Sequence, residues 1–190
     1  MLKIAILASG SGSNAQALVE HFAQSSWGRV EIIVTNNPHA GVIQRAERLG
    51  IACKSFDPKT QSDEILMLLE SNADIILLAG YLRMIPANWT RAFQGRMFNI
   101  HPALLPKFGG KGMYGKYVHE AVSAAGESVT GITIHTVNEH YDEGAIVAQY
   151  QVEITPGEAA HSIEEKVREL ELEYFGPTIE SWIAQLSEQQ

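Results

Sequence analysis

Residues 74–79 read Asp-Ile-Ile-Leu-Leu-Ala, an almost uninterrupted apolar run. A run of this kind is typical of a strand that is buried on both faces, as strands are in a parallel sheet covered by helices. Residues 2–8, Leu-Lys-Ile-Ala-Ile-Leu-Ala, form a second run of the same character near the start of the chain. These two segments predict an α/β protein built on a parallel sheet.

Apolar runs alternate with helix-like stretches on both sides of residues 74–79. Gly50 is expected to end one of these helices, and Pro86 is expected to begin another. The alternation predicts a doubly wound, mostly parallel, Rossmann-like sheet. The expected strands are residues 2–8, 30–35, 51–56, 74–79 and 97–100, and the expected helices are residues 13–22, 42–49, 63–70 and a short segment after Pro86.

The pattern changes after Pro106. Residues 108–115 are rich in glycine and are expected to form a loop, and residues 117–125 are expected to form a helix. Residues 129–137 and 145–154 are predicted to be two strands with no helix between them. They therefore predict an antiparallel hairpin that is appended to the parallel sheet.

A long helix is expected at the end of the chain, over residues 162–186. Gly176-Pro177 is expected to break or kink it, because proline lacks the backbone N–H that a helix needs. The sequence shows no internal repeat and no linker, so residues 1–190 are expected to form a single domain.

The composition restricts the class of partner. A formal net charge of −8 argues against nucleic acid or an acidic membrane, which bind basic faces, but not against a small anion held by backbone amides. A single cysteine, Cys53, cannot form an internal disulfide, which favours a reducing cytoplasm. Residues 1–4, Met-Leu-Lys-Ile, do not begin a signal-peptide pattern, and no apolar run is long enough to cross a bilayer. A cytoplasmic protein without a membrane partner is expected.

The segment Phe98-Asn99-Ile100-His101-Pro102 carries the clearest chemical signal. Alternate strand residues point to the same face, so Asn99 and His101 emerge together. Pro102 keeps His101 extended. An amide donor beside an imidazole can stabilise negative charge that develops on an oxygen atom. The alternative is a strand end at which Asn99 caps backbone groups and His101 packs, and these residues alone fit both interpretations.

A glycine-rich segment, Ser9-Gly10-Ser11-Gly12-Ser13-Asn14, follows the first expected strand. Glycines let a ligand approach the backbone, and the free amides of a helix start attract anions. The spacing lacks the third glycine of a dinucleotide motif and the lysine of a Walker loop, so a monophosphate site is favoured. The alternative is a tight turn before a capped helix, since Ser13 and Gln16 fit a capping box.

Two further segments are candidates for ligand contact. Residues 80–86 follow the strand at 74–79, and ligands of open α/β sheets bind beyond the carboxyl ends of strands. Residues 138–144 connect the two strands of the hairpin and supply Asp142, a carboxylate that could hold His101 protonated. Glu139 and Glu143 are equal contenders for that role from sequence alone.

The other histidines give no metal signal. His135 fits either the same site or a packed position in its strand. The remaining histidines lack the spacing of metal ligands, so no metal site is expected.

The chain resembles the phosphoribosylglycinamide formyltransferases, folate-dependent enzymes of purine synthesis, over nearly its whole length. Together the shared motifs are specific in their order and spacing. They are Gly10-Ser11-Gly12-Ser13-Asn14, Ala79-Gly80-Tyr81-Leu82-Arg83, Asn99-Ile100-His101-Pro102 with Leu104-Leu105-Pro106, and Asp142-Glu143-Gly144.

The resemblance implies the formyltransferase fold and a transfer of the formyl group of 10-formyltetrahydrofolate to the amine of glycinamide ribonucleotide. It implies direct attack by the amine, an oxyanion stabilised by Asn99 and protonated His101, and support from Asp142. It also implies a monomer or homodimer whose partners are these two small molecules, with no metal and no nucleic acid.

The resemblance also assigns binding residues. Lys59 stands where the family often has an arginine near the folate tail, and Glu171 matches a late-helix glutamate that contacts the ribonucleotide. The ribonucleotide set is Gly12, Ser13, Asn14 and Glu171. The folate set is Lys59, Leu82, Arg83, Met84, Ile85, Asn99, Asn138, Glu139, His140, Tyr141 and Asp142.

One segment departs from the family pattern. Residues 107–114, Lys-Phe-Gly-Gly-Lys-Gly-Met-Tyr, are longer and richer in glycine than the usual loop, and His119 is the candidate for the later family histidine, without an assigned role. The rival enzymes are a formyltetrahydrofolate hydrolase and a methionyl-tRNA formyltransferase, which normally carry an additional domain. A rival from another class is a non-catalytic nucleotide-binding module, which would leave Asn99, His101 and Asp142 unexplained.

Overall fold

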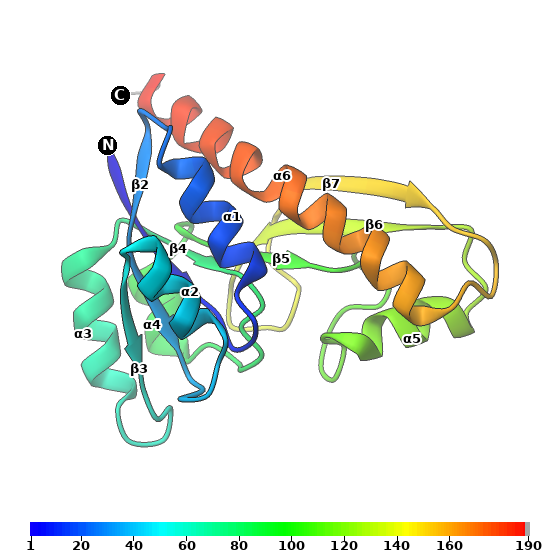
Figure 1. Cartoon of the computed structure of the whole chain (residues 1–190), viewed down its shortest axis with the longest axis horizontal. Coiled ribbons are helices and arrows are strands. Elements are labelled where there is room, and N and C mark those ends of the chain that lie inside the picture. The colour runs from blue at the N-terminus through cyan, green and yellow to red at the C-terminus, as the bar shows by residue number, and fades with distance from the viewer. Residues whose placement is uncertain (189–190) are drawn as a thin grey trace.

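A seven-stranded sheet forms the centre of the computed structural model, which describes residues 1–188 (Figure 1). Its strand order is β3-β2-β1-β4-β5-β6-β7. The first five strands pair in parallel, and β6 and β7 are antiparallel to their neighbours, which confirms the mostly parallel sheet and the appended hairpin. The strands are β1 (Leu2–Leu7), β2 (Gly28–Thr35), β3 (Ala52–Ser55), β4 (Ile75–Leu78), β5 (Met97–His101), β6 (Val129–Thr136) and β7 (Ile146–Glu153).

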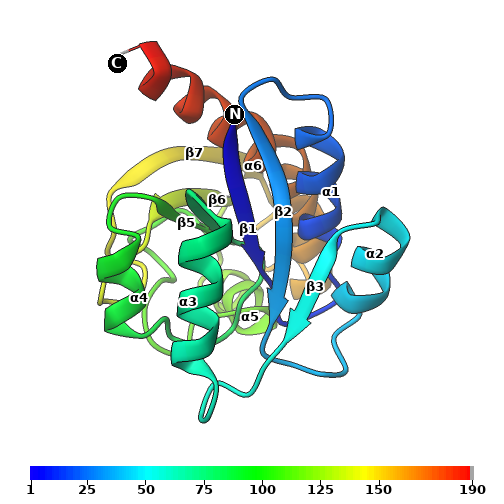
Figure 2. The ribbon, with the colours of Figure 1, turned by 90° about the vertical axis from the view of Figure 1, so that its left-hand side faces the viewer.

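Helices cover both faces of the sheet. The alternation of side chains along a strand sends Ile4 and Ile6 of β1 to one apolar core, and Ala5 and Leu7 to the other. The first core is closed by α1, α2, α5 and α6, and the second by α3 and α4, which lie across β1 from α1 (Figure 2). The helices are α1 (Ser13–Phe22), α2 (Val42–Leu49), α3 (Ser62–Asn72), α4 (Ala87–Ala92), α5 (Lys116–Ala124) and α6 (Ala160–Glu188).

One local expectation at a helix position is wrong, and a second is wrong in part. The capping box of Ser13 and Gln16 does not form, because Gly12 is the N-cap residue of α1 and the Gln16 side chain donates to Glu20 instead. Of the break or kink expected at Gly176-Pro177, the break does not occur, and α6 runs as one helix from Ala160 to Glu188. Pro177 removes only one N–H, and the residues around it are buried against α1, where a Cβ on Gly176 would lie 2.8 Å from the ring of His21.

The parallel pairing decides where a ligand can bind. Strands β1, β4 and β5 are neighbours and run in the same direction, so their carboxyl ends meet at one edge of the sheet. The segments that follow them therefore converge there, as ligand-binding segments do in open α/β sheets. Among residues 1–188, no helix combines the length and the apolar character that a membrane crossing requires.

Candidate active site

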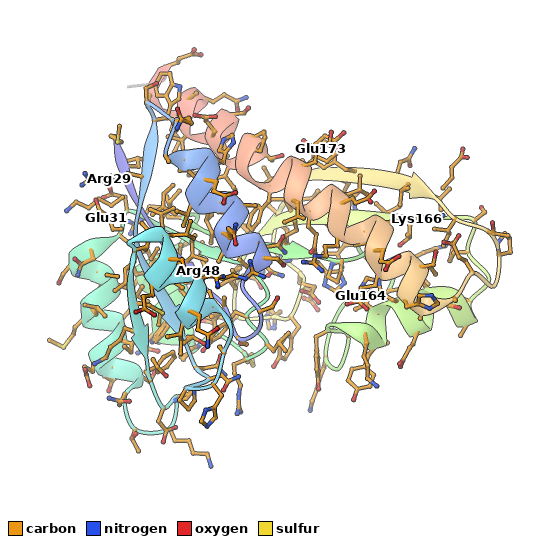
Figure 3. The ribbon with its side chains drawn as sticks, viewed as in Figure 1. Arg29, Glu31, Arg48, Glu164, Lys166 and Glu173 are labelled. Atoms are coloured by element: carbon orange, nitrogen blue, oxygen red, sulfur yellow. The ribbon has the colours of Figure 1, made fainter. Side chains whose placement is uncertain are left out.

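A cavity of about 600 Å³ opens at this edge of the sheet. It is lined by the segments that follow β1, β4 and β5, by the turn between β6 and β7, and by one side of α6. Glu164, on the N-terminal part of α6, belongs to this lining (Figure 3). Within residues 1–188 no group of three or more His, Cys, Asp and Glu side chains is arranged to hold a metal ion.

Asn99, His101 and Asp142 lie together in this cavity. Asn99 and His101 share a face of β5, and Nδ1 of His101 lies 3.6 Å from Oδ2 of Asp142. Of the two other carboxylates considered for this position, Glu139 instead pairs with Arg91 at 3.7 Å. The turn after β6 thus brings a carboxylate to the end of β5.

His101 is almost fully buried, with 3% of its surface exposed. Its Nε2 lies 2.8 Å from the carbonyl oxygen of Phe108, and because a carbonyl only accepts, Nε2 donates this hydrogen bond. Burial lowers the pKa of His101 below its ordinary value, and this outweighs the opposite effects of the Asp142 charge and of the Phe108 carbonyl. Asp142 raises the pKa of His101, as expected, but burial has the larger effect.

Asp142 is held in an unusual backbone conformation, with φ of 57°. Gly144 permits the tight turn, because a Cβ there would lie 1.6 Å from the carbonyl oxygen of Thr136. Burial raises the pKa of Asp142. Three neighbours lower it by more than burial raises it: the imidazoles of His135 and His101, and the Gly110 amide, which donates to Oδ2 at 2.8 Å. The net pKa is low, so the site contains a carboxylate anion.

His135 also belongs to this cluster. The sequence leaves open whether it lies in the site or packs within its strand. It lies on β6 directly opposite Asn99, and 2% of its surface is exposed. Its Nε2 lies 3.1 Å from Nδ2 of Asn99 and 3.6 Å from Oδ1 of Asp142. The pairing register of β5 and β6 would have predicted that His135 belongs to the site, but a hydrophobic pattern alone does not specify this register.

The glycine segment forms one part of the cavity wall, where Ser11, Ser13 and Asn14 contribute to the lining. Gly12 adopts φ of 81°, and a Cβ on it would lie 2.5 Å from a methyl group of Val42, so only glycine fits. Helix α1 begins without a side-chain cap, which leaves its first amides facing outward at its positive end. An anion would be stabilised there.

Glu171 reaches this part of the cavity from α6. Its Oε2 accepts a hydrogen bond of 2.8 Å from Nδ2 of Asn14, whereas Oδ1 of Asn14 is buried without a partner among the described residues. Burial raises the pKa of Glu171 to about 7, although the Asn14 hydrogen bond and the Arg168 charge act in the opposite direction. A buried carboxyl and a free amide oxygen thus face the space beside the glycine segment.

The two segments proposed for the folate both line the cavity. Leu82, Met84 and Tyr141 are strongly exposed for apolar side chains, as is common at ligand-binding sites. The first segment is fixed to the glycine segment, since the amide of Leu82 donates to the Ser9 hydroxyl at 3.0 Å. The lining includes Leu82, Arg83, Met84, Ile85, Asn138, His140, Tyr141 and Asp142.

Three of the predicted contact residues lie outside the cavity lining in the described part of the chain: Gly12, Lys59 and Glu139. Gly12 lies between two lining residues, Glu139 is paired with Arg91, and Lys59 lies in the segment between β3 and α3. Lys59 is therefore separated from the other folate candidates.

The glycine-rich loop covers one side of the site, and residues 110–115 line the cavity. His119 of α5 also contributes to the lining and is 4% exposed. Its Nδ1 has no hydrogen-bond partner among the described residues. Burial lowers the pKa of His119, more than the charge of Glu164 raises it.

Comparison with known proteins gives a consistent result. A protein-family model described as formyl transferase matches residues 2–179. A protein of Bacillus subtilis (strain 168), phosphoribosylglycinamide formyltransferase, is 35% identical over 94% of this chain and 93% of its own length. A protein of Vigna unguiculata, phosphoribosylglycinamide formyltransferase, chloroplastic, is 41% identical over 94% of this chain.

The chain spans 60% of the Vigna unguiculata protein and 66% of the corresponding Arabidopsis thaliana protein. Among solved structures, glycinamide ribonucleotide transformylase 1 of Geobacillus kaustophilus is similar, with a TM-score of 0.87 and 37% identity over 96% of this chain and 99% of that one. The family match over most of the chain and the full-length bacterial relative agree with the site geometry: the chain belongs to the formyl transferase family, and within it to the phosphoribosylglycinamide formyltransferases.

Proposed function

We propose that the protein transfers the formyl group of 10-formyltetrahydrofolate to the amine of glycinamide ribonucleotide, in purine synthesis in the cytoplasm. One observation carries the proposal: a single cavity joins Asn99, His101 and Asp142 to the uncapped start of α1. The phosphate of the ribonucleotide would bind the amides of Gly12, Ser13 and Asn14, where a helix start attracts an anion. The folate would lie between residues 82–85 and residues 138–142.

The reaction requires that one carbon–nitrogen bond form as another breaks. The ribonucleotide amine attacks the formyl carbon, and the carbonyl oxygen becomes an oxyanion that the amide N–H of Asn99 and the imidazole of His101 stabilise. The tetrahedral intermediate then collapses, and the bond from the carbon to the folate nitrogen breaks. The amine loses one proton and the folate nitrogen gains one. His101 supplies the latter as a general acid through its Nε2–H, which must leave the Phe108 carbonyl to reach the substrate.

The low pKa of His101 fits this role. A group whose pKa is lowered by burial is a stronger acid once it is protonated, but a smaller fraction of it is protonated at a given pH. The Asp142 charge opposes the effect of burial and so preserves part of that fraction. The pair therefore balances acid strength against the amount of acid present.

Turnover measurements test this proposal against its rivals. The purified protein is supplied with 10-formyltetrahydrofolate alone, with glycinamide ribonucleotide added, or with methionyl-tRNA added, and release of tetrahydrofolate is followed. We expect rapid release only with the ribonucleotide, and loss of that activity in His101→Ala. Equal release without an acceptor would indicate a hydrolase, and release that requires the charged tRNA would indicate a tRNA formyltransferase.

A further inference from the structure

His135 is a buried histidine that the proposed reaction leaves without a role. Its ring has two contacts that differ in kind: Nδ1 lies 2.8 Å from the carbonyl oxygen of Thr136, and Nε2 lies 3.1 Å from Nδ2 of Asn99. A carbonyl only accepts hydrogen bonds, so Nδ1 carries a proton. In a neutral ring with its proton on Nδ1, Nε2 carries no proton and offers a lone pair, so it can accept a hydrogen bond. The Thr136 contact therefore assigns the Nδ1–H tautomer to the neutral form of His135.

This tautomer fixes the orientation of Asn99. The amide of an asparagine can rotate by half a turn and exchange its oxygen with its nitrogen, and the surrounding hydrogen bonds decide between the two orientations. With Nε2 of His135 as an acceptor, the nitrogen of Asn99 points toward His135. One of its two N–H groups is then engaged, and the other remains for the oxyanion. If Nε2 carried a proton, the amide would turn over and present its oxygen to His135.

The shared carboxylate couples the two imidazoles. Asp142 lies between two imidazoles, with Oδ2 at 3.6 Å from Nδ1 of His101 and Oδ1 at 3.6 Å from Nε2 of His135. A single negative charge cannot fully offset two neighbouring imidazolium ions, and a charge on His135 opposes protonation of His101.

We propose that His135 is a positioning residue for formyl transfer: in its Nδ1–H tautomer it accepts a hydrogen bond from Asn99 and thereby holds the amide nitrogen in the orientation that stabilises the oxyanion. The role in catalysis rests on the proposed function. The tautomer and the contact with Asn99 can be measured without any turnover.

Two amide substitutions test the roles of the two ring nitrogens of His135 separately. His135→Gln places an amide oxygen near the position of Nε2, where it can accept from Asn99, and His135→Asn places an amide near Nδ1 and removes the Nε2 acceptor. We expect His135→Asn to lower kcat by about 10- to 100-fold, somewhat less than loss of an oxyanion donor, with KM for both substrates within about 2-fold. His135→Gln should retain kcat to within about 5-fold, since it keeps the acceptor. Thr130→Val, an equally buried change on β6, controls for disturbance of the strand.

A double mutant shows whether His135 acts through Asn99. If it does, Asn99→Ala with His135→Asn should be no slower than Asn99→Ala alone, because the orientation of a missing amide no longer matters. Multiplied losses in the double mutant, or equal losses in His135→Gln and His135→Asn, would overturn the proposal.

Nitrogen NMR measures the tautomer of His135 in the unmutated protein, so the result does not depend on whether a variant folds. Spectra of the ¹⁵N-labelled imidazoles at neutral pH should show His135 with a proton on Nδ1 and none on Nε2. A proton on Nε2 would overturn the inference even if the protein is an active transferase. The expected tautomer in a protein without transferase activity would contradict the proposed function, and would leave the His135–Asn99 contact in place.

Discussion

Asp142 and the burial of the site have opposite effects on the pKa of His101. Burial favours the neutral imidazole, and the carboxylate 3.6 Å away favours the charged one. Removing the charge while retaining the shape therefore removes the anion that helps to protonate His101. The two side chains should behave in catalysis as one unit.

A double-mutant cycle tests this unit. We expect His101→Ala to lower kcat/KM by about 10²- to 10⁴-fold, as loss of a general acid does. Asp142→Asn should also lower it, and the double mutant should be only slightly worse than His101→Ala. Fully additive losses would mean that Asp142 acts elsewhere, for example by shaping the turn after β6.

The pH dependence of Asp142→Asn gives an independent check. Activity that requires protonated His101 is lost as the pH rises through the pKa of His101. Without the Asp142 charge this pKa falls further, so the loss of kcat should begin at a lower pH than in the wild type. A profile that keeps its position while only its height falls would contradict the proposed charge effect.

Glu171 should make stability depend on pH in the opposite sense to an ordinary ion-paired carboxylate. Its pKa is raised to about 7 in the folded protein, so the folded state binds more protons than the unfolded state below that pH. The free energy of unfolding should therefore fall as the pH rises through this range. Glu171→Gln removes the ionisation. The Tm of this variant minus that of the wild type should therefore increase as the pH rises from about 5 to 8.

Thermal unfolding of both proteins at several pH values measures this difference. Glu169→Gln, an exposed change on the same helix, serves as the control and should show a nearly constant difference from the wild type. A constant difference for Glu171→Gln as well would show that Glu171 is ionised in the folded protein throughout this range.

For individual helices, local sequence signals predicted the ends correctly where no distant packing opposed them. Helix α2 ends at Leu49 because Gly50 adopts φ of 68°, a conformation that glycine supplies without strain. The signals failed where distant packing opposed them, as at Pro177, whose missing hydrogen bond is tolerated because α6 is packed along its buried side. They also failed at the start of α1, where Gly12 must fit against Val42 and leaves no place for a capping side chain.

The start of α1 offers a matched pair of substitutions. Gly12→Ala forces a Cβ into the left-handed region and against Val42, whereas a Cβ on Gly10 would meet no atom within 4 Å. We expect Gly12→Ala to raise the KM for the ribonucleotide by about 10-fold or more, because the amides that bind the phosphate are displaced. Gly10→Ala should change it by less than about 3-fold. Equal weakening of folate and ribonucleotide binding by Gly12→Ala would argue against a dedicated phosphate site.

For the whole molecule, the architecture could be predicted but the site could be predicted only in part. The parallel sheet follows from apolar runs such as residues 74–79, and the carboxyl edge follows from the parallel pairing. The contact between Asp142 and His101 could not be derived from periodicity, since it depends on how the turn after β6 folds back. The same is true of His135, whose position opposite Asn99 depends on strand register.

Folate binding should link two distant segments. Residues 82–85 and residues 138–142 line one cavity although they are far apart in the chain. A bound folate analogue should therefore slow amide hydrogen exchange in both segments together, since one ligand covers both. Slowing confined to the glycine segment at residues 9–14 would contradict this assignment of the pocket.

The reaction proposed for the cavity moves a formyl group between two bound molecules. It can be followed by single-turnover transfer from 10-formyltetrahydrofolate that carries a labelled formyl carbon. The label should appear in the amide of formylglycinamide ribonucleotide with little labelled formate, and His101→Ala should slow its arrival by about 10²-fold or more without changing its destination. Labelled formate produced at the same rate with and without the ribonucleotide would contradict formyl transfer as the reaction of this site.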